Sequence, residues 1–534
     1  MAWCLLPKFA EQFKKDLVEG KITPEKLNDM GSEGRHKFFA ERFGEENATQ
    51  LNSLFESKLL LKNKQMGYVN WAKQGLGLKP EVRRDLVARI EKMDRVLNPV
   101  EEKAFLKDLA SKKLGTEVSY EEAQKIHELS KKVSEHKNFS THEQRIKYGN
   151  AILDLQDYTE SLVSHSWKET ALGVANLPRS LMSTLDLSAP MRQGWGMMSR
   201  KEWLTAFGDM FKLAVSKKSY RNMMADIITR PSYDLMKDGK LRITKLTGKL
   251  SDREERFLSP IISKIPFLKG SERAYTGFLN KLRADTFDRM IADAKLAGED
   301  VGKGSQGVKD IASVINDFTG SGNLGRNDKY NGAVPFLNAF FFSPRKIAAT
   351  INMVNPIKYA TLTPRARRSA LRNLIGSVSI TATLLSLASL MGADVETDPR
   401  SSDFGKAKFG NTRFDFTGGN GNYATLLARL ITNKTKSTKT GKVKEMGKGY
   451  KPLTRYELSL KWGRNKLSPT ASFIADWMAG SNGIGEKFEL GSSLGSRMYP
   501  MIIGDVIETY KDDPSLVLPV LGADLFGVGT NTYK

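Results

Sequence analysis

The residues that first suggest catalysis are Gly491, Ser493 and Gly495, which have the Gly-x-Ser-x-Gly spacing of a nucleophile elbow. In α/β hydrolases this motif presents the serine to a histidine base, and that histidine follows the serine in the chain. All five histidines here precede residue 166: His36, His127, His136, His142 and His165. Ser493 therefore has no downstream base, and we interpret the motif as a turn.

Two further catalytic patterns lack the context that their chemistry needs. The glycine spacing of Gly320-Ser-Gly322-Asn-Leu-Gly325 matches a dinucleotide-binding loop, but such a loop follows a strand, whereas a predicted helix over 308–319 precedes it here. The spacing of Ser343-Pro-Arg-Lys346 matches acyl-enzyme serines, but the accompanying motifs are missing and the proline is typical of a helix start. Neither pattern predicts a site.

Metal-binding residue types are sparse. The single cysteine, Cys4, supports neither a disulfide nor a cysteine-based zinc site. The pairs His127-Glu128 and His142-Glu143 lack a second histidine at the fourth following position, so neither is a zinc-protease helix. We expect no metal, no cofactor and no catalytic residue, and we predict that the protein is not an enzyme.

The most basic stretch, residues 434–466, predicts contact with nucleic acid. Eleven Lys and Arg stand there against two glutamates, with Tyr450, Tyr456 and Trp462 among them. Cations suit phosphate contacts and aromatic rings suit base stacking, although a solvated lysine-rich linker is the alternative. The candidate DNA-binding residues are Lys434, Lys436, Lys439, Lys442, Lys444, Lys448, Lys451, Arg455, Lys461, Arg464 and Lys466.

The net charge of +23 is unevenly distributed. Residues 1–165 carry 28 Lys and Arg against 26 Asp and Glu, whereas the remaining 369 residues carry 55 against 34. Such a basic field attracts nucleic acid or anionic lipid without sequence specificity. We therefore expect DNA and an anionic membrane to meet the C-terminal two-thirds.

Residues 374–393 form an uncharged, largely apolar segment in a chain that is otherwise rich in charge. As a helix these twenty residues would extend about 30 Å, the thickness of a bilayer core or the diameter of a small domain. Ser and Thr are spread around the helical wheel, so we expect a helix buried in protein or in lipid rather than an amphipathic surface helix. The candidate core or membrane residues are Leu374, Ile375, Val378, Ile380, Leu384, Leu385, Leu387 and Leu390.

The elements that would position these residues are mostly helices. Apolar spacings of three and four predict a mainly α fold, with an N-terminal helical bundle over 1–150 in which Ser119 and Glu122 form a capping box. A helical middle region over 151–330 and a C-terminal module over 331–534 follow. The module holds the central apolar helix, the basic stretch and a small β-hairpin near residues 406–417.

Several separated motifs resemble one protein family, in the same order along residues 150–510. They are LPRSLMSTLDLSAPMRQG at 177–194, ERAYTGFLNKLRADTFDRM at 272–290, PFLNAFFFSPRKIAA at 335–349, DPRSSDFGKAKFGNTRFDFTGG at 398–419 and RNKLSPTASFIADWMAG at 464–480. Together they resemble the C-terminal region of the large polyvalent proteins of tailed bacteriophages. The resemblance implies packaging in the virion and delivery with the DNA, but this chain lacks the upstream enzyme motifs of that family.

The first expectation is a non-enzymatic internal or ejection-associated virion protein that binds phage DNA non-specifically, meets other virion proteins and contacts the host membrane. Its first fifteen residues lack the basic-then-apolar order of a secretory signal, so we expect synthesis in a cytoplasm. After delivery it would lie in the host cytoplasm or inner membrane. The alternatives are a structural adaptor or scaffold of the head, neck or tail, and a non-catalytic part of a split polyvalent enzyme.

Overall fold

The computed structural model describes residues 23–73, 80–162, 188–244, 266–325, 329–448, 453–481, 487–495 and 501–532. These residues are mainly helical with short strands, which confirms the predicted fold class. Contacts divide the chain into unit 1, Met1–Ser140 with Ala151–Ser164, and unit 2, Thr141–Asn150 with His165–Lys534. The expected division into three regions is finer than this and stays a prediction.

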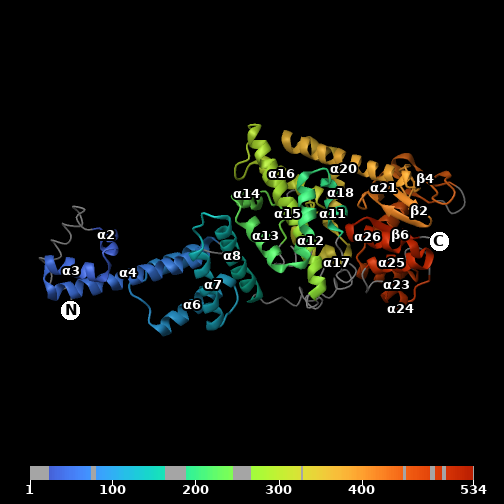
Figure 1. Cartoon of the computed structure of the whole chain (residues 1–534). Helices are drawn as coiled ribbons and strands as arrows, with labels where there is room; N and C mark the ends of the chain where they lie inside the picture. Colours follow the sequence, from blue (N-terminus) through green and yellow to red (C-terminus); the bar gives the residue numbers. More distant parts are fainter. Residues whose placement is uncertain are drawn as a thin grey trace. The chain divides into compact units, whose positions relative to one another are not determined.

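Unit 1 is built from helices joined by short connections (Figure 1). They are α2 (Pro24–Asp29), α3 (Gly31–Phe43), α4 (Glu45–Lys73), α5 (Pro80–Glu91), α6 (Pro99–Leu114), α7 (Tyr120–Glu135) and the later part of α8 (His142–Leu162). The predicted capping box at Ser119 is present, because its side chain accepts from the Glu122 backbone N–H while the Glu122 carboxylate accepts from the Ser119 N–H. A second box, Asn98 with Glu101, begins α6.

Aromatic residues fill the core of the first helices of unit 1. Phe39 and Phe43 of α3 are buried with Leu27 of α2 and Ala48 of α4. Beside them the buried Arg35 donates to Asn52 Oδ1 at 3.2 Å and to the Leu27 carbonyl at 3.1 Å. The guanidinium is thus satisfied within the protein, as a buried charged group requires.

Unit 2 is organised around the long helix α15, which lies among its neighbours in Figure 1. Phe278, Leu282 and Phe287 of α15 are completely buried because α12, α13 and α16 pack around them. The helices of this layer are α11 (Ala189–Arg192), the 3-10 turn η1 (Gly194–Met197), α12 (Lys201–Val215), α13 (Lys217–Ile228), α14 (Tyr233–Asp238), α15 (Pro266–Leu296) and α16 (Gln306–Phe318).

The predicted apolar helix, residues 374–393, begins ten residues earlier and ends three residues earlier in the structure. It is α20 (Pro364–Leu390), which begins with a proline in its first turn and ends before Met391. Ala393, the last residue of the predicted segment, already lies outside the helix. The helices that precede α20 are α17 (Val334–Phe340), α18 (Pro344–Val354) and α19 (Pro356–Thr361), after the 3-10 turn η5 (Asn331–Ala333).

The predicted hairpin near residues 406–417 is confirmed and belongs to a larger sheet. Strands β2 (Lys406–Phe409) and β3 (Thr412–Asp415) are antiparallel and are joined by Gly410 and Asn411, with Gly410 at φ +55°. The sheet order is β1-β2-β3-β6, with β1 at Asp394–Val395 and β6 at Gly529–Thr532, all pairs antiparallel. A strand from the end of the sequence therefore completes the sheet.

The remaining elements follow in the chain, and of these α25 and α26 contact strand β6. They are α21 (Gly421–Thr432), β4 (Lys434–Lys436), β5 (Val443–Glu445), α22 (Arg455–Arg464), α23 (Pro469–Ala479), α24 (Leu490–Gly495), α25 (Met501–Asp512), the 3-10 turn η6 (Pro514–Leu516) and α26 (Val517–Phe526). The Gly491–Gly495 motif is part of helix α24. Our interpretation of that motif as a turn was therefore wrong.

Candidate functional site

Helix α20 packs against the rest of unit 2 through a face whose most buried residues are small or polar. Its buried residues include Asn373, Ser377 and Thr381, together with Ala366 and Ala370. These positions recur every three or four residues and therefore share one face of the helix. The most buried positions of α20 therefore carry small or polar side chains, and Leu374, Ile380 and Leu384 pack beside them as partly buried residues.

Specific hydrogen bonds hold this buried face. Trp195 of η1 donates from Nε1 to Thr381 Oγ1 at 3.0 Å, in a buried environment. Arg200 donates from Nε to Asn373 Oδ1 at 2.8 Å and also hydrogen-bonds Ser369. Gly376 permits a close approach, because a Cβ at this position would lie 2.4 Å from Ser199 Oγ. The helix is therefore fixed by polar contacts that a lipid environment would not supply.

The opposite side of α20 is exposed and carries large apolar residues together with Ser379, Thr383, Ser386 and Ser389. Exposed fractions are 43% for Leu371, 64% for Ile375, 52% for Val378 and Leu387, and 85% for Leu390. Among the described residues, α20 is the helix that is long and apolar enough to cross a membrane, yet only 22% of its most apolar stretch is buried. A core helix would be mostly buried, whereas most of this stretch of α20 is not covered by other parts of the described chain.

The eight residues predicted for this helix divide between the two environments. Leu374, Ile380 and Leu384 are partly buried against a core that contains Trp195 and Phe414. Leu385 packs against the small core formed by Ala388, Ala393 and Ala407. The others, Ile375, Val378, Leu387 and Leu390, are exposed.

Apolar residues of neighbouring helices extend the exposed face of α20. We define the α20 surface as Leu371, Ile375 and Val378 of α20, Ile351 and Val354 of α18, Ile357 of α19, and Leu427 and Ile431 of α21, each at least 43% exposed. Val354, Val378 and Leu427 all line one pocket, which brings the three helices together. Ile351, Ile375 and Ile431 lie about one turn away from these along their helices.

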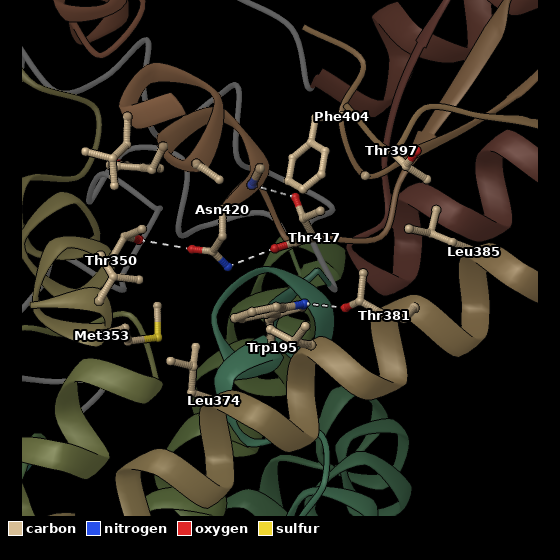
Figure 2. A pocket seen from close by; sticks show the side chains of 18 of the residues that line it. Trp195, Thr350, Met353, Leu374, Thr381, Leu385, Thr397, Phe404, Thr417 and Asn420 are labelled. Atoms are coloured by element: carbon tan, nitrogen blue, oxygen red, sulfur yellow. Dashed lines mark hydrogen bonds between the residues drawn. The ribbon is translucent and has the colours of Figure 1, made fainter. Parts of the chain in front are cut away.

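The pocket beside α20 has a volume of about 420 Å³, within the range of about 300–1,000 Å³ typical of small-molecule sites. In Figure 2, Leu374, Thr381 and Leu385 come from α20, Thr350 and Met353 from α18, and Trp195 from η1. Further lining residues include Phe404, Thr417, Asn420, Tyr423, Ala424 and Leu427. The walls are thus assembled from segments that are distant in the sequence.

Several polar side chains of the pocket hydrogen-bond one another or the backbone (Figure 2). Thr350 donates to Asn420 Oδ1 at 3.1 Å, and Asn420 Nδ2 donates to the Thr417 carbonyl at 2.8 Å. The Gly421 N–H donates to Thr417 Oγ1 at 2.8 Å, and Trp195 donates to Thr381 as described above. These bonds fix the shape of the pocket and leave mainly hydrocarbon facing its interior.

One carboxylate, that of Glu396, lines the pocket, and its charge is balanced by Lys436, which does not line the pocket. Lys436 of β4 lies 2.7 Å from Glu396 Oε2, and the Asp398 N–H donates to Oε1 at 2.9 Å. Burial alone would raise the pKa of Glu396, but these hydrogen bonds and the lysine charge outweigh it and hold that pKa below its usual value. Lys436, predicted to contact DNA, is therefore committed to an internal ion pair.

The basic stretch is structured rather than a plain linker. Strands β4 and β5 form an antiparallel hairpin in which Lys434 pairs with Glu445 and Thr435 with Lys444. Seven of the predicted DNA-binding residues are exposed on this hairpin or on the segments around α22. They are Lys434, Lys439, Lys442, Lys444, Lys448, Arg455 and Lys461.

The other cations of the stretch serve the fold or lie outside the described residues. Arg464 lies 2.6 Å from the buried Asp476, and Lys466 stacks over the rings of Tyr423 and Trp462 at 4.8 and 5.3 Å. Lys451 lies outside the described residues, as does Tyr450. Trp462 also packs edge-on against Tyr423 at 5.2 Å, so its ring is already occupied.

Further exposed apolar residues lie on α17 and α23, two helices that contact each other. Phe336 and Phe340 of α17 are 59% and 46% exposed, with ring centroids 4.7 Å apart. Trp477 and Met478 of α23 are 65% and 78% exposed. We call these four residues the aromatic patch.

Sequence reasoning missed Trp195, Thr417 and Asn420, which shape the pocket floor. No local pattern marks them, since each acquires its role from a contact with a distant segment. Comparisons of this chain with models of known protein families, with curated protein sequences and with solved structures find no match.

Proposed function

We propose that this chain is a non-enzymatic, virion-associated bacteriophage protein that is delivered with the DNA, engages an anionic membrane through the α20 surface and binds DNA non-specifically. The phage context is supported by the ordered motifs between residues 150 and 510. The observation that carries the membrane contact is the set of exposed apolar side chains on α20 and its neighbours, with Leu371, Ile375 and Val378 of α20 each at least 43% exposed.

The arrangement favours a helix that lies on a membrane over one that crosses it. Leaving the body of unit 2 would break the hydrogen bonds that Trp195 and Arg200 make to α20. Lying on the interface keeps these bonds and buries the exposed face of Leu371, Ile375 and Val378 in the acyl boundary. The exposed Arg368 and Arg372 on the same helix would meet anionic headgroups, each contributing about 1 kcal/mol.

DNA binding is supported by the position of the exposed lysines. Lys439 lies in the turn of the β4–β5 hairpin, Lys442 lies just before β5, and Lys444 lies within β5. A two-stranded ribbon fits a DNA groove, and phosphate contacts of this kind carry no sequence information. The hairpin and its lysines therefore suit non-specific binding.

Vesicle flotation tests the membrane contact. Full-length protein is expected to float with vesicles containing 30 mol % phosphatidylglycerol (about one-third anionic lipid) and much less with pure phosphatidylcholine, because anionic lipid adds to apolar burial. The double variant Leu371→Glu/Ile375→Glu should lose at least about tenfold in vesicle affinity, since it places two charges at the interface.

A matched control changes exposed apolar residues elsewhere in unit 2. Leu204 and Val215 of α12 are 64% and 85% exposed, so Leu204→Glu/Val215→Glu introduces the same charges on a different helix. This variant should float like the unmodified protein. Equal flotation of the α20 variant and the unmodified protein would contradict the proposal.

A structural adaptor of the virion is the second candidate, and the aromatic patch favours it. Exposed Trp, Phe and Met are enriched at protein interfaces, where such residues often carry most of the binding energy. An adaptor should appear as symmetric, stoichiometric copies in a virion reconstruction, with Phe336 and Trp477 in contact with a neighbour. Low-copy density without symmetry would favour the delivered internal protein instead.

A further inference from the structure

We propose that the pocket beside α20 binds one acyl chain of an anionic membrane phospholipid. This inference rests on the proposed membrane contact and gives it a specific ligand. The pocket of about 420 Å³ opens between α18, α20 and α21, where Val354, Val378 and Leu427 are each more than half exposed. These rim residues belong to the α20 surface, so a bilayer on that surface would lie directly over the opening.

The chemistry of the lining selects hydrocarbon. The Thr350, Asn420 and Thr417 side chains bond one another or the backbone, and Trp195 is bonded to Thr381. The Glu396 carboxylate is held by Lys436. A polar ligand would have to break these bonds, whereas an acyl chain needs no hydrogen bond and gains from leaving water.

A peptide segment suits the pocket less well than a lipid chain. Each peptide unit brings an N–H and a C=O, and burying either without a partner is costly. The polar groups of the floor, around Asn420 and Thr381, are already used by the fold. An acyl chain fills the same volume without that cost.

The charges around the α20 surface suit an anionic headgroup. Arg368 and Arg372 are exposed and precede Leu371 and Ile375 by three residues, about one helical turn. A phospholipid whose chain enters at Val378 can therefore place its phosphate at a guanidinium of the same helix. Charge complementarity and apolar continuity together point to a membrane lipid as the occupant.

The test uses full-length protein and the fluorescent fatty acid cis-parinaric acid, with lyso-phosphatidylglycerol as a competitor. The unmodified protein should bind the probe saturably with one strong site, and the single-chain anionic phospholipid should displace it. Saturable probe binding that lyso-phosphatidylglycerol does not displace would overturn the phospholipid assignment. Absence of saturable binding would overturn the site itself and favour a protein side chain as the occupant.

Variants separate the pocket from the surrounding surface. Ala382 and Ala424 line the pocket and are exposed at its rim, so Ala382→Phe/Ala424→Phe should obstruct it, reduce probe affinity at least tenfold and leave helicity unchanged. The control Ala360→Phe changes an exposed residue outside the lining and should bind normally. Unchanged probe binding by the obstructed variant would contradict the inference.

Failure of the inference and failure of the proposed function give different results. Leu371→Glu/Ile375→Glu alters residues of the surface that do not line the pocket, so it should lose flotation while it still binds the probe. The obstructed variant should keep the flotation that depends on the rest of the surface. Flotation without any acyl binding would refute the pocket alone, whereas no flotation of the unmodified protein would refute the membrane contact.

Discussion

Trp195 and Thr381 are 186 residues apart in the sequence, yet the indole Nε1 donates to the threonine hydroxyl at 3.0 Å in a buried environment. This bond joins η1 to the middle of α20. It explains why a threonine at position 381 is buried on a largely apolar helix, because the buried indole N–H requires an acceptor there.

Replacing Thr381 with Val should destabilise unit 2, because the change leaves the buried Trp195 N–H without its partner. The expected loss is about 1–3 kcal/mol in the free energy of unfolding, measured by urea titration. Thr383 supplies a control on the same helix, since it is exposed and bonds only the Ser379 carbonyl. Thr383→Val should stay within about 0.5 kcal/mol of the unmodified protein.

Asp505 of α25 predicts a pH dependence of stability. Burial, followed by the charges of Asp524 and Glu508, raises its pKa to about 7, although Arg192 opposes the shift. The folded state therefore binds a proton that the unfolded state releases near its ordinary pKa of about 4. Stability from this group is full below that value and falls as pH rises toward 7.

Urea unfolding between pH 5 and pH 8 measures this effect. The unmodified protein should lose stability across the interval, and Asp505→Asn should lose less because it carries no titrating proton there. An identical pH profile for both proteins would show that other groups determine the trend.

The β4–β5 hairpin predicts a salt-dependent contact with DNA. Lys439→Ala/Lys444→Ala should weaken binding equally for unrelated DNA sequences and reduce the slope of log affinity against log salt by about two. Lys217→Ala/Lys218→Ala on α13 removes two exposed lysines elsewhere and serves as the control. Mobility-shift titrations across a salt series measure both, and affinity independent of salt would argue against phosphate binding.

Gly418 should tolerate a side chain poorly, because its φ is +62° and a Cβ would lie 2.3 Å from the Met191 carbonyl oxygen. Gly410 in the β2–β3 turn has φ +55° but no atom within 4 Å of such a Cβ. Gly410→Ala should therefore cost only the conformational term, about 1–2 kcal/mol. Gly418→Ala should cost more, and comparable unfolding free energies would contradict the close approach.

Local signals in the sequence predicted much of the helical fold and the hairpin. Ser119 with Glu122 marks a helix start through bonds to neighbouring backbone, and Gly410-Asn411 fits a two-residue turn, so both depend on adjacent residues. The prediction of a helix at residues 374–393 was correct in type. Which side of this helix is buried could not be predicted from neighbouring residues, because it depends on contacts with the distant Trp195 and Arg200.

The candidate site was less predictable for the same reason. The exposed lysines of the basic stretch follow from composition, but nothing near Lys436 indicates that it pairs with Glu396, forty residues earlier. The pocket has walls from η1, α18, α20 and α21, so its residues acquire a common role only after folding. Spacing along a sequence carries no information about such an assembly.

Strand β6 can join the sheet only after the ribosome has translated it, long after its partner β3. It pairs with β3, and Thr530 is the partner of Phe414. At roughly 5–20 residues per second, a ribosome needs on the order of 6–24 s to pass from β3 to the end of β6. During that interval one edge of β3 stays unpaired on the nascent chain. A chaperone that covers exposed strand edges would protect the chain most during this interval.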